Sequence, residues 1–125
     1  MISNQRIEVY ENSGVFLMGR YKGGDGSLIT QASISSIAIK VYDDGDPTAA
    51  VDELALTVAD VVFDALQTDE RWQEDSSGYN FGYALPAESL PDGQKNYNVE
   101  VKFTPASGEA FYDVFYLHTN TIHSE

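Results

Sequence analysis

The chain contains no cysteine, which excludes a disulfide framework and a thiolate metal site. Basic residues are also scarce, because seven Lys and Arg stand against 20 Asp and Glu and leave a formal net charge of −13. Nucleic-acid binding depends on Lys and Arg that displace counterions from phosphates. We therefore expect no nucleic-acid partner and no binding to an anionic membrane surface. The acidity keeps free copies apart in solution, and it also suits a basic partner.

Long apolar runs are missing as well. No stretch approaches the ~20 apolar residues that span a bilayer, and no charged and apolar leader opens the sequence. We expect a protein without a membrane segment or a secretory signal. Its 125 residues predict a single domain over 1–125, long enough to bury roughly two-thirds of its unfolded surface.

Catalytic motifs are absent too. The sequence has no nucleophile elbow and no His-Glu-x-x-His helix, and His118 and His123 follow no metal-binding or triad spacing. The turn Gly23-Gly24-Asp25-Gly26 lacks the glycine spacing and the following Lys-Ser/Thr of a phosphate loop. A glycosidase would need two carboxylates facing each other across a cleft. We therefore expect a protein that is not an enzyme and that carries no cofactor.

An acidic turn, Asp43-Asp44-Gly45-Asp46, is the one candidate for a cation site. Clustered carboxylates on a turn suit calcium. The EF-hand pattern fails, however, because the sixth position counted from Asp44 is Ala49 and the twelfth is Ala55. Since Asp and Gly favour turns for conformational reasons, we expect a solvated turn and no metal.

The strongest structural pattern lies between residues 90 and 117. Tyr97, Val99, Val101 and Phe103 alternate with polar residues, which predicts a strand with one buried and one solvated face. A turn at 104–109 precedes a second strand from Ala110 to His118, which is apolar on both faces. Further alternation predicts strands near 7–10, 15–21, 37–42, 48–58 and 79–85, the last with Tyr79 and Phe81 on one face.

Residues 59–68 are ambiguous, because Asp60 could cap a helical turn while the run Val61-Val62-Phe63 also suits a strand. We favour a short helical turn near 60–67, and we expect the single tryptophan, Trp72, to plug one end of the core. Seven to eight short strands separated by turns predict an all-β, antiparallel β-sandwich. A small closed barrel is the alternative.

The pattern Leu90-x-x-Gly93-x-x-x-Tyr97-x-Val99-x-Val101 resembles the entry into the sixth strand of immunoglobulin-like and fibronectin type III domains. In those domains a tyrosine near the strand start hydrogen-bonds back across the corner. The resemblance implies an immunoglobulin-like sandwich in which Tyr97 has this role and Gly93 shapes the corner. The match has one extra residue between the glycine and the tyrosine, and it says nothing about function.

A second resemblance covers most of the chain. The segments Tyr10-Glu11-Asn12-x-Gly14-Val15-Phe16 and Val61-Val62-Phe63-Asp64-x-Leu66-x-x-Asp69-x-x-Trp72, with the following Asp75-x-x-Gly78-Tyr79, are similar to small immunoglobulin-like proteins of tailed bacteriophages. Such proteins are head decoration, neck, tail or baseplate components. The resemblance implies a structural protein located in the virion, whose partners are other virion proteins and its own copies.

Aromatic residues are abundant, with eight Tyr, six Phe and one Trp. Several of them lie opposite the expected core faces, which is typical of a protein interface, although packing on both faces of a thick sandwich would also explain them. We expect interface contacts from Phe16, Met18, Tyr112 and Tyr116. A carbohydrate- or ligand-binding module that stacks sugars on exposed Tyr and on Trp72 is the alternative function.

Overall fold

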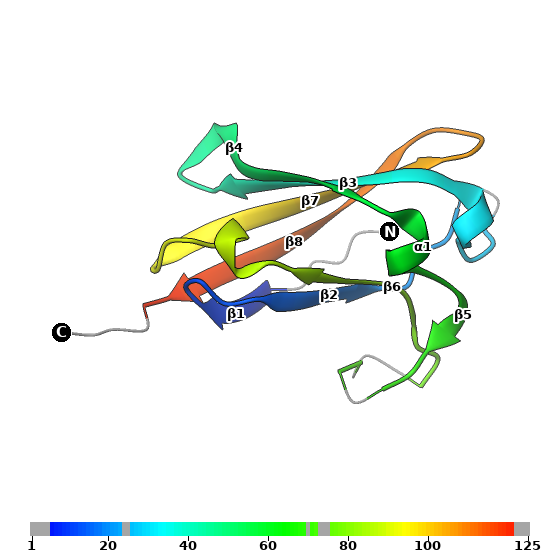
Figure 1. Cartoon of the computed structure of the whole chain (residues 1–125), viewed down its shortest axis with the longest axis horizontal. Coiled ribbons are helices and arrows are strands. Elements are labelled where there is room, and N and C mark those ends of the chain that lie inside the picture. The colour runs from blue at the N-terminus through cyan, green and yellow to red at the C-terminus, as the bar shows by residue number, and fades with distance from the viewer. Residues whose placement is uncertain (1–5, 24–25, 70, 73–75, 122–125) are drawn as a thin grey trace.

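Eight strands in two sheets make up almost all of the regular structure (Figure 1). The structure is a computed structural model that describes residues 6–23, 26–69, 71–72 and 76–121, so the rest of the expected 1–125 domain lies outside the described residues. The prediction of an all-β fold is confirmed. The strands are β1 (Arg6–Tyr10), β2 (Val15–Gly19), β3 (Ile34–Asp43), β4 (Asp46–Leu56), β5 (Val62–Gln67), β6 (Tyr79–Leu85), β7 (Lys95–Pro105) and β8 (Phe111–Asn120). The helical elements are short: α1 (Val58–Val61), η1 (Gln31–Ser33) and η2 (Ala87–Ser89).

The larger sheet has the strand order β1-β8-β7-β3-β4, and the smaller one has the order β2-β6-β5. The long strands β3, β7 and β8 lie side by side in Figure 1. In β7 the residues of one phase, Tyr97 to Phe103, are buried, as the alternation predicts. They face a core that both sheets share, to which the smaller sheet contributes Leu17, Val62, Phe81 and Leu85.

One pairing departs from the expected antiparallel arrangement. β1 runs parallel to β8, from Arg6 opposite Tyr116 to Tyr10 opposite Asn120. The turn after Tyr10 sends the chain from the larger sheet into β2 of the smaller one, so β1 cannot form a hairpin with its successor. The five other pairings between described strands are antiparallel.

The helical turn near 60–67 is wrong in its extent. The helix occupies only Val58–Val61, and residues 62–67 form β5. Val62 pairs with Phe81 of β6 and is fully buried. A β-branched residue fits such a strand position better than a helix, and pairing with β6 therefore decides between the two conformations.

The face predicted for β6 is also wrong at its first residue. Phe81 lies in the core, but the ring of Tyr79 packs outside it, against Phe63 at a centroid distance of 5.9 Å. The pairing of β2 with β6 ends at Phe81. Beyond that point the Asn80 side chain hydrogen-bonds the backbone N and O of Tyr21, at 2.9 and 3.0 Å. These bonds hold the Asn80 side chain against Tyr21, so the side chains at the start of β6 do not alternate between core and surface as the sequence predicts.

Trp72 does not plug the core. It is half-buried, it lies outside the core cluster, and its ring packs 5.7 Å from the ring of Tyr79. Tyr79 also contacts the rings of Phe16 and Phe63 on the outer side of the smaller sheet. The Trp72 ring therefore joins an aromatic group on that side.

The corner before β7 contains the hydrogen bond that the resemblance implies. The Tyr97 hydroxyl accepts a bond from the Asp92 N–H at 3.2 Å and lies 3.5 Å from the Asp92 carbonyl oxygen. The buried Thr119 hydroxyl donates a shorter bond, 2.6 Å, to that carbonyl. A Cβ on Gly93 would lie 3.0 Å from the Thr121 Cα, so this glycine permits close approach of the corner to the end of β8.

Candidate functional site

The outer side of the larger sheet carries three rows of side chains, which run across β8, β7, β3 and β4. The register gives the twelve members of this group, which we call the sheet face: Tyr112-Lys102-Ala38-Ala55, Val114-Glu100-Lys40-Glu53 and Tyr116-Asn98-Tyr42-Ala50. On β8, β7 and β3 these residues alternate with buried ones, such as Asp113, Phe115 and Leu117 on β8, whereas on the edge strand β4 the alternate residues Leu54 and Leu56 are half-buried. The sequence folds in this way because the phase that faces the core is mostly apolar and the other is mixed.

Tyr112 and Tyr116 are the most exposed aromatic residues of the sheet face, with 53% and 42% of their surface accessible. They lie four residues apart on the same face of β8, with the half-buried Val114 between them on that face. The Lys102 ammonium lies over the Tyr112 ring at 5.9 Å from its centroid, a favourable cation–π position. The two predicted contacts on β8 are therefore brought together on one accessible surface.

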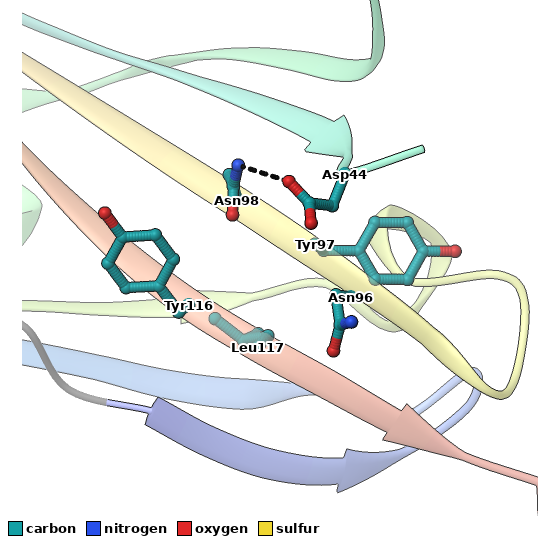
Figure 2. Close-up of a pocket in the computed structure, with 6 residues that line it drawn as sticks. All are labelled: Asp44, Asn96, Tyr97, Asn98, Tyr116 and Leu117. Carbon is teal, nitrogen blue, oxygen red and sulfur yellow. Dashed lines mark hydrogen bonds between the residues drawn. The ribbon is translucent and has the colours of Figure 1, made fainter. Parts of the chain in front are cut away.

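A shallow pocket of about 360 Å³ adjoins this surface (Figure 2). Its lining residues are Asp44, Asn96, Tyr97, Asn98, Tyr116 and Leu117. The Asn98 amide donates a hydrogen bond to the Asp44 carboxylate at 3.4 Å. Beside it, the Asn96 side-chain oxygen lies 2.8 Å from Nδ1 of His118. The pocket thus combines the accessible ring of Tyr116 with amide and carboxylate groups, while Tyr97, which also lines it, is buried.

Phe16 and Met18, the other two predicted contacts, lie on the smaller sheet, away from the β8 tyrosines. Phe16 is half-buried, because the Arg71 guanidinium sits 3.9 Å above its ring. A Cβ on Gly82 would lie 2.7 Å from the Phe16 ring, so this glycine makes room for the aromatic group. Part of the aromatic surplus is therefore packed within the chain. A groove of about 580 Å³ also runs past Phe16, Phe63 and Gly82.

Arg71 connects the rings of Phe16 and Tyr79 through a cation–π contact and a small polar network. It pairs with the Asp69 carboxylate at 3.1 Å and donates to the Tyr79 hydroxyl at 3.1 Å, and that hydroxyl donates to Asp69 at 2.6 Å. The hydrogen bond from Arg71 lowers the pKa of Asp69, with a further contribution from Tyr79. Burial raises the pKa of Tyr79, and its hydrogen bond to Asp69 acts in the same direction.

The acidic turn between β3 and β4 has internal partners. Asp43 accepts the Gly45 N–H at 2.9 Å and pairs with Lys95 at 3.2 Å. The Gly45 bond, with help from Lys95, lowers the pKa of Asp43. Among the described residues, no group of three or more His, Asp or Glu side chains is arranged to hold a metal ion. In the same part of the chain, no helix has the length and apolar character needed to cross a membrane.

Sequence reasoning missed Asn96, Asn98 and Thr119. The two asparagines lie on the solvated face of β7, and the alternation of the sequence predicts only that they are exposed to solvent. Their proximity to Asp44 depends on the pairing of β7 with β3, which no local pattern reveals. Thr119 had no local signal either, because its partner carbonyl lies 27 residues away.

Comparison with known protein families gives no match, and comparison with curated protein sequences gives none either.

Proposed function

We propose that this chain is a non-enzymatic structural protein of a bacteriophage virion, a head decoration, neck, tail or baseplate component that acts through protein–protein contacts. The sheet face is its contact surface. The observation that carries the proposal is the pair of accessible tyrosines, Tyr112 and Tyr116, on one face of long paired strands. Tyrosine is enriched at the energetically important centres of interfaces.

The distribution of aromatic residues supports the choice of this face over the smaller sheet. On the smaller sheet, Arg71 already covers Phe16, and Tyr79 packs against Trp72. On the sheet face, no part of the described chain covers Tyr112 or Tyr116 to a comparable extent, since about half of each remains accessible. An immunoglobulin-like assignment is part of the same proposal. The Tyr97 corner and the five- and three-stranded sheets support it.

The proposal is tested in the phage whose genome encodes the chain. Purified particles are analysed for the protein by quantitative mass spectrometry, and we expect a fixed copy number per particle. Tyr116→Asp in the sheet face should greatly reduce incorporation. Placing a carboxylate in a desolvated contact costs several kcal/mol unless it is paired.

The control is Leu28→Asp, which places the same charge on an accessible apolar residue, 38% exposed, that lies outside the strands of both sheets. Both variants should fold, as judged by circular dichroism and thermal unfolding. Absence of the wild-type chain from purified particles would overturn the proposal. Equal incorporation of Tyr116→Asp and wild type would remove the sheet face as its contact surface.

Saccharide binding is the second candidate, and the pocket in Figure 2 favours it. An accessible aromatic ring beside amide and carboxylate groups suits a polyhydroxylated ligand. The ring can cover the apolar face of the sugar, and the polar groups can bind its hydroxyl groups. Titration with oligosaccharides, followed by NMR of the asparagine side-chain amides, is the test. Shifts of Asn96 and Asn98 that disappear in Asn98→Ala would support it, and unchanged spectra would reject it. Trp72 fluorescence is a poor reporter, because Trp72 packs against the other sheet.

A further inference from the structure

The charge of the chain is unevenly distributed. The twelve residues of the sheet face include two lysines, Lys40 and Lys102, and two glutamates, Glu53 and Glu100, so their formal charges cancel. Outside the face remain 18 acidic and five basic residues, whose difference accounts for the whole net charge of −13. Because these twelve residues carry no net charge, two copies of this acidic protein can meet on the sheet face without net repulsion between the facing residues.

We propose that the partner on the sheet face is a second copy of this chain, bound face to face about a two-fold axis. The axis runs along the strands, between β7 and β3. This inference rests on the proposed function, since it names the occupant of the same surface. Two-fold dimers are the commonest oligomers, and they require a self-complementary patch.

The registered rows provide such a patch. Rotation about this axis exchanges β8 with β4, so Tyr112 faces Ala55 of the second copy and Tyr116 faces Ala50. A large side chain therefore meets a small one at both ends. In the middle row, Glu100 faces Lys40 of the second copy, and the rotation forms this pair twice. Large-to-small packing and opposite charges both favour the arrangement.

Edge-to-edge pairing of the larger sheet is a weaker competitor. Its free edge on this side is β4, where the register shifts between Val41 and Tyr42, and such irregularities hinder pairing with another chain. The Asp52 side chain also accepts the Glu53 N–H at 2.9 Å. A strand added there would have to displace that bond.

Site-directed cross-linking tests the arrangement, and the absence of native cysteine keeps the experiment clean. Tyr112→Cys and Ala55→Cys proteins are mixed and treated with a bis-maleimide that bridges the ~10 Å between packed sheets. We expect a cross-linked heterodimer from the mixture. Tyr112→Cys alone should cross-link poorly, because three strand spacings of ~4.8 Å add a sideways offset of about 14 Å between the two copies of residue 112.

The control pair is Leu28→Cys with Ala55→Cys, since Leu28 is accessible, at 38%, and lies outside the sheet face. Light scattering of the wild type should give a mass that rises with concentration to twice 13.8 kDa. Lys40→Glu should raise the dissociation constant by about tenfold or more, because it places like charges opposite each other. The double variant Lys40→Glu/Glu100→Lys should restore it.

A wild-type protein that stays monomeric at all concentrations would overturn the inference, as would equal cross-linking of the control pair. These failures differ from failure of the proposed function. A monomer whose Tyr116→Asp variant is still excluded from particles would keep the sheet face as a contact surface and assign it to a different virion protein.

Discussion

The Tyr21 hydroxyl donates a hydrogen bond to the Asp113 carboxylate inside the core. Tyr21 follows β2 of the smaller sheet, and Asp113 belongs to β8 of the larger one, so the bond joins the two layers. Both residues are almost completely buried, with 2% and 1% of their surface accessible. The second Asp113 oxygen accepts the Val114 N–H at 2.8 Å. Both carboxylate oxygens of this buried acid on β8 therefore accept hydrogen bonds.

Removal of this bond should destabilise the fold. Tyr21→Phe keeps the ring packing on Phe81 and Phe103 but withdraws a donor from a buried carboxylate, at a cost of about 2 kcal/mol. Urea unfolding measures the loss. In Tyr21→Phe/Asp113→Leu, removal of both polar partners should cost less than the sum of the two single changes. Additive losses would show that the two groups do not interact.

The same contact should make stability sensitive to alkaline pH. Burial, with the neighbouring Asp113 charge, raises the pKa of Tyr21 far above its usual value of 10.0. A group whose pKa is raised by folding contributes its stability below the unfolded pKa and loses it as pH rises. The free energy of unfolding should therefore fall above pH 10, by up to about 1.4 kcal/mol per pH unit for this one group. Urea titrations at several alkaline pH values should show a shallower fall for Tyr21→Phe, and an unchanged slope would contradict the prediction.

The polar network around Asp69 should respond to acid. The depressed pKa of Asp69 means that its contacts with Arg71 and Tyr79 persist at pH 3.8, the usual carboxyl value, and are lost only as pH falls through the lower folded pKa. Trp72 is the only tryptophan and packs on Tyr79, so its fluorescence reports the loss. Asp69→Asn should show the altered emission already at neutral pH. A midpoint near pH 3.8, or a neutral Asp69→Asn spectrum identical to wild type, would contradict this account.

The sequence was sufficient for β3 and β7 because the central residues of one phase of each strand are apolar. In β7, Tyr97 to Phe103 are buried, and in β3 the same holds for Ile37, Ile39 and Val41. The conformation of residues 59–68 could not be decided from the sequence pattern, because valine and phenylalanine suit both a helical turn and a strand. The pairing of Val62 with Phe81 decides it. The face predicted for Tyr79 was wrong because its neighbour Asn80 hydrogen-bonds the backbone of Tyr21, beyond the point where the pairing of β2 with β6 ends.

The candidate surface was predictable only in part. The phase of β8 sets Tyr112 and Tyr116 opposite the buried Phe115, so their shared face follows from alternation. Phe16 has the same local pattern, yet Arg71, 55 positions further along the chain, covers it. The charge balance of the sheet face depends on the register that places Lys40 beside Glu100 and Glu53. Non-local pairing of this kind has no signature in a single sequence.

At the corner before β7, the hydroxyl groups of Thr119 and Tyr97 can be ranked by how much each should contribute to stability. Thr119 donates to the Asp92 carbonyl at 2.6 Å and accepts the Lys95 N–H at 3.2 Å, whereas the Tyr97 hydroxyl lies 3.5 Å from the same carbonyl. Thr119→Val keeps the shape of the side chain and removes two part-buried hydrogen bonds, which should cost about 2 kcal/mol in total. Tyr97→Phe loses the bond from the Asp92 N–H and should cost less, about 1 kcal/mol. Urea unfolding of the two variants measures both losses. A larger loss for Tyr97→Phe would show that the tyrosine, and not the threonine, holds the corner against the end of β8.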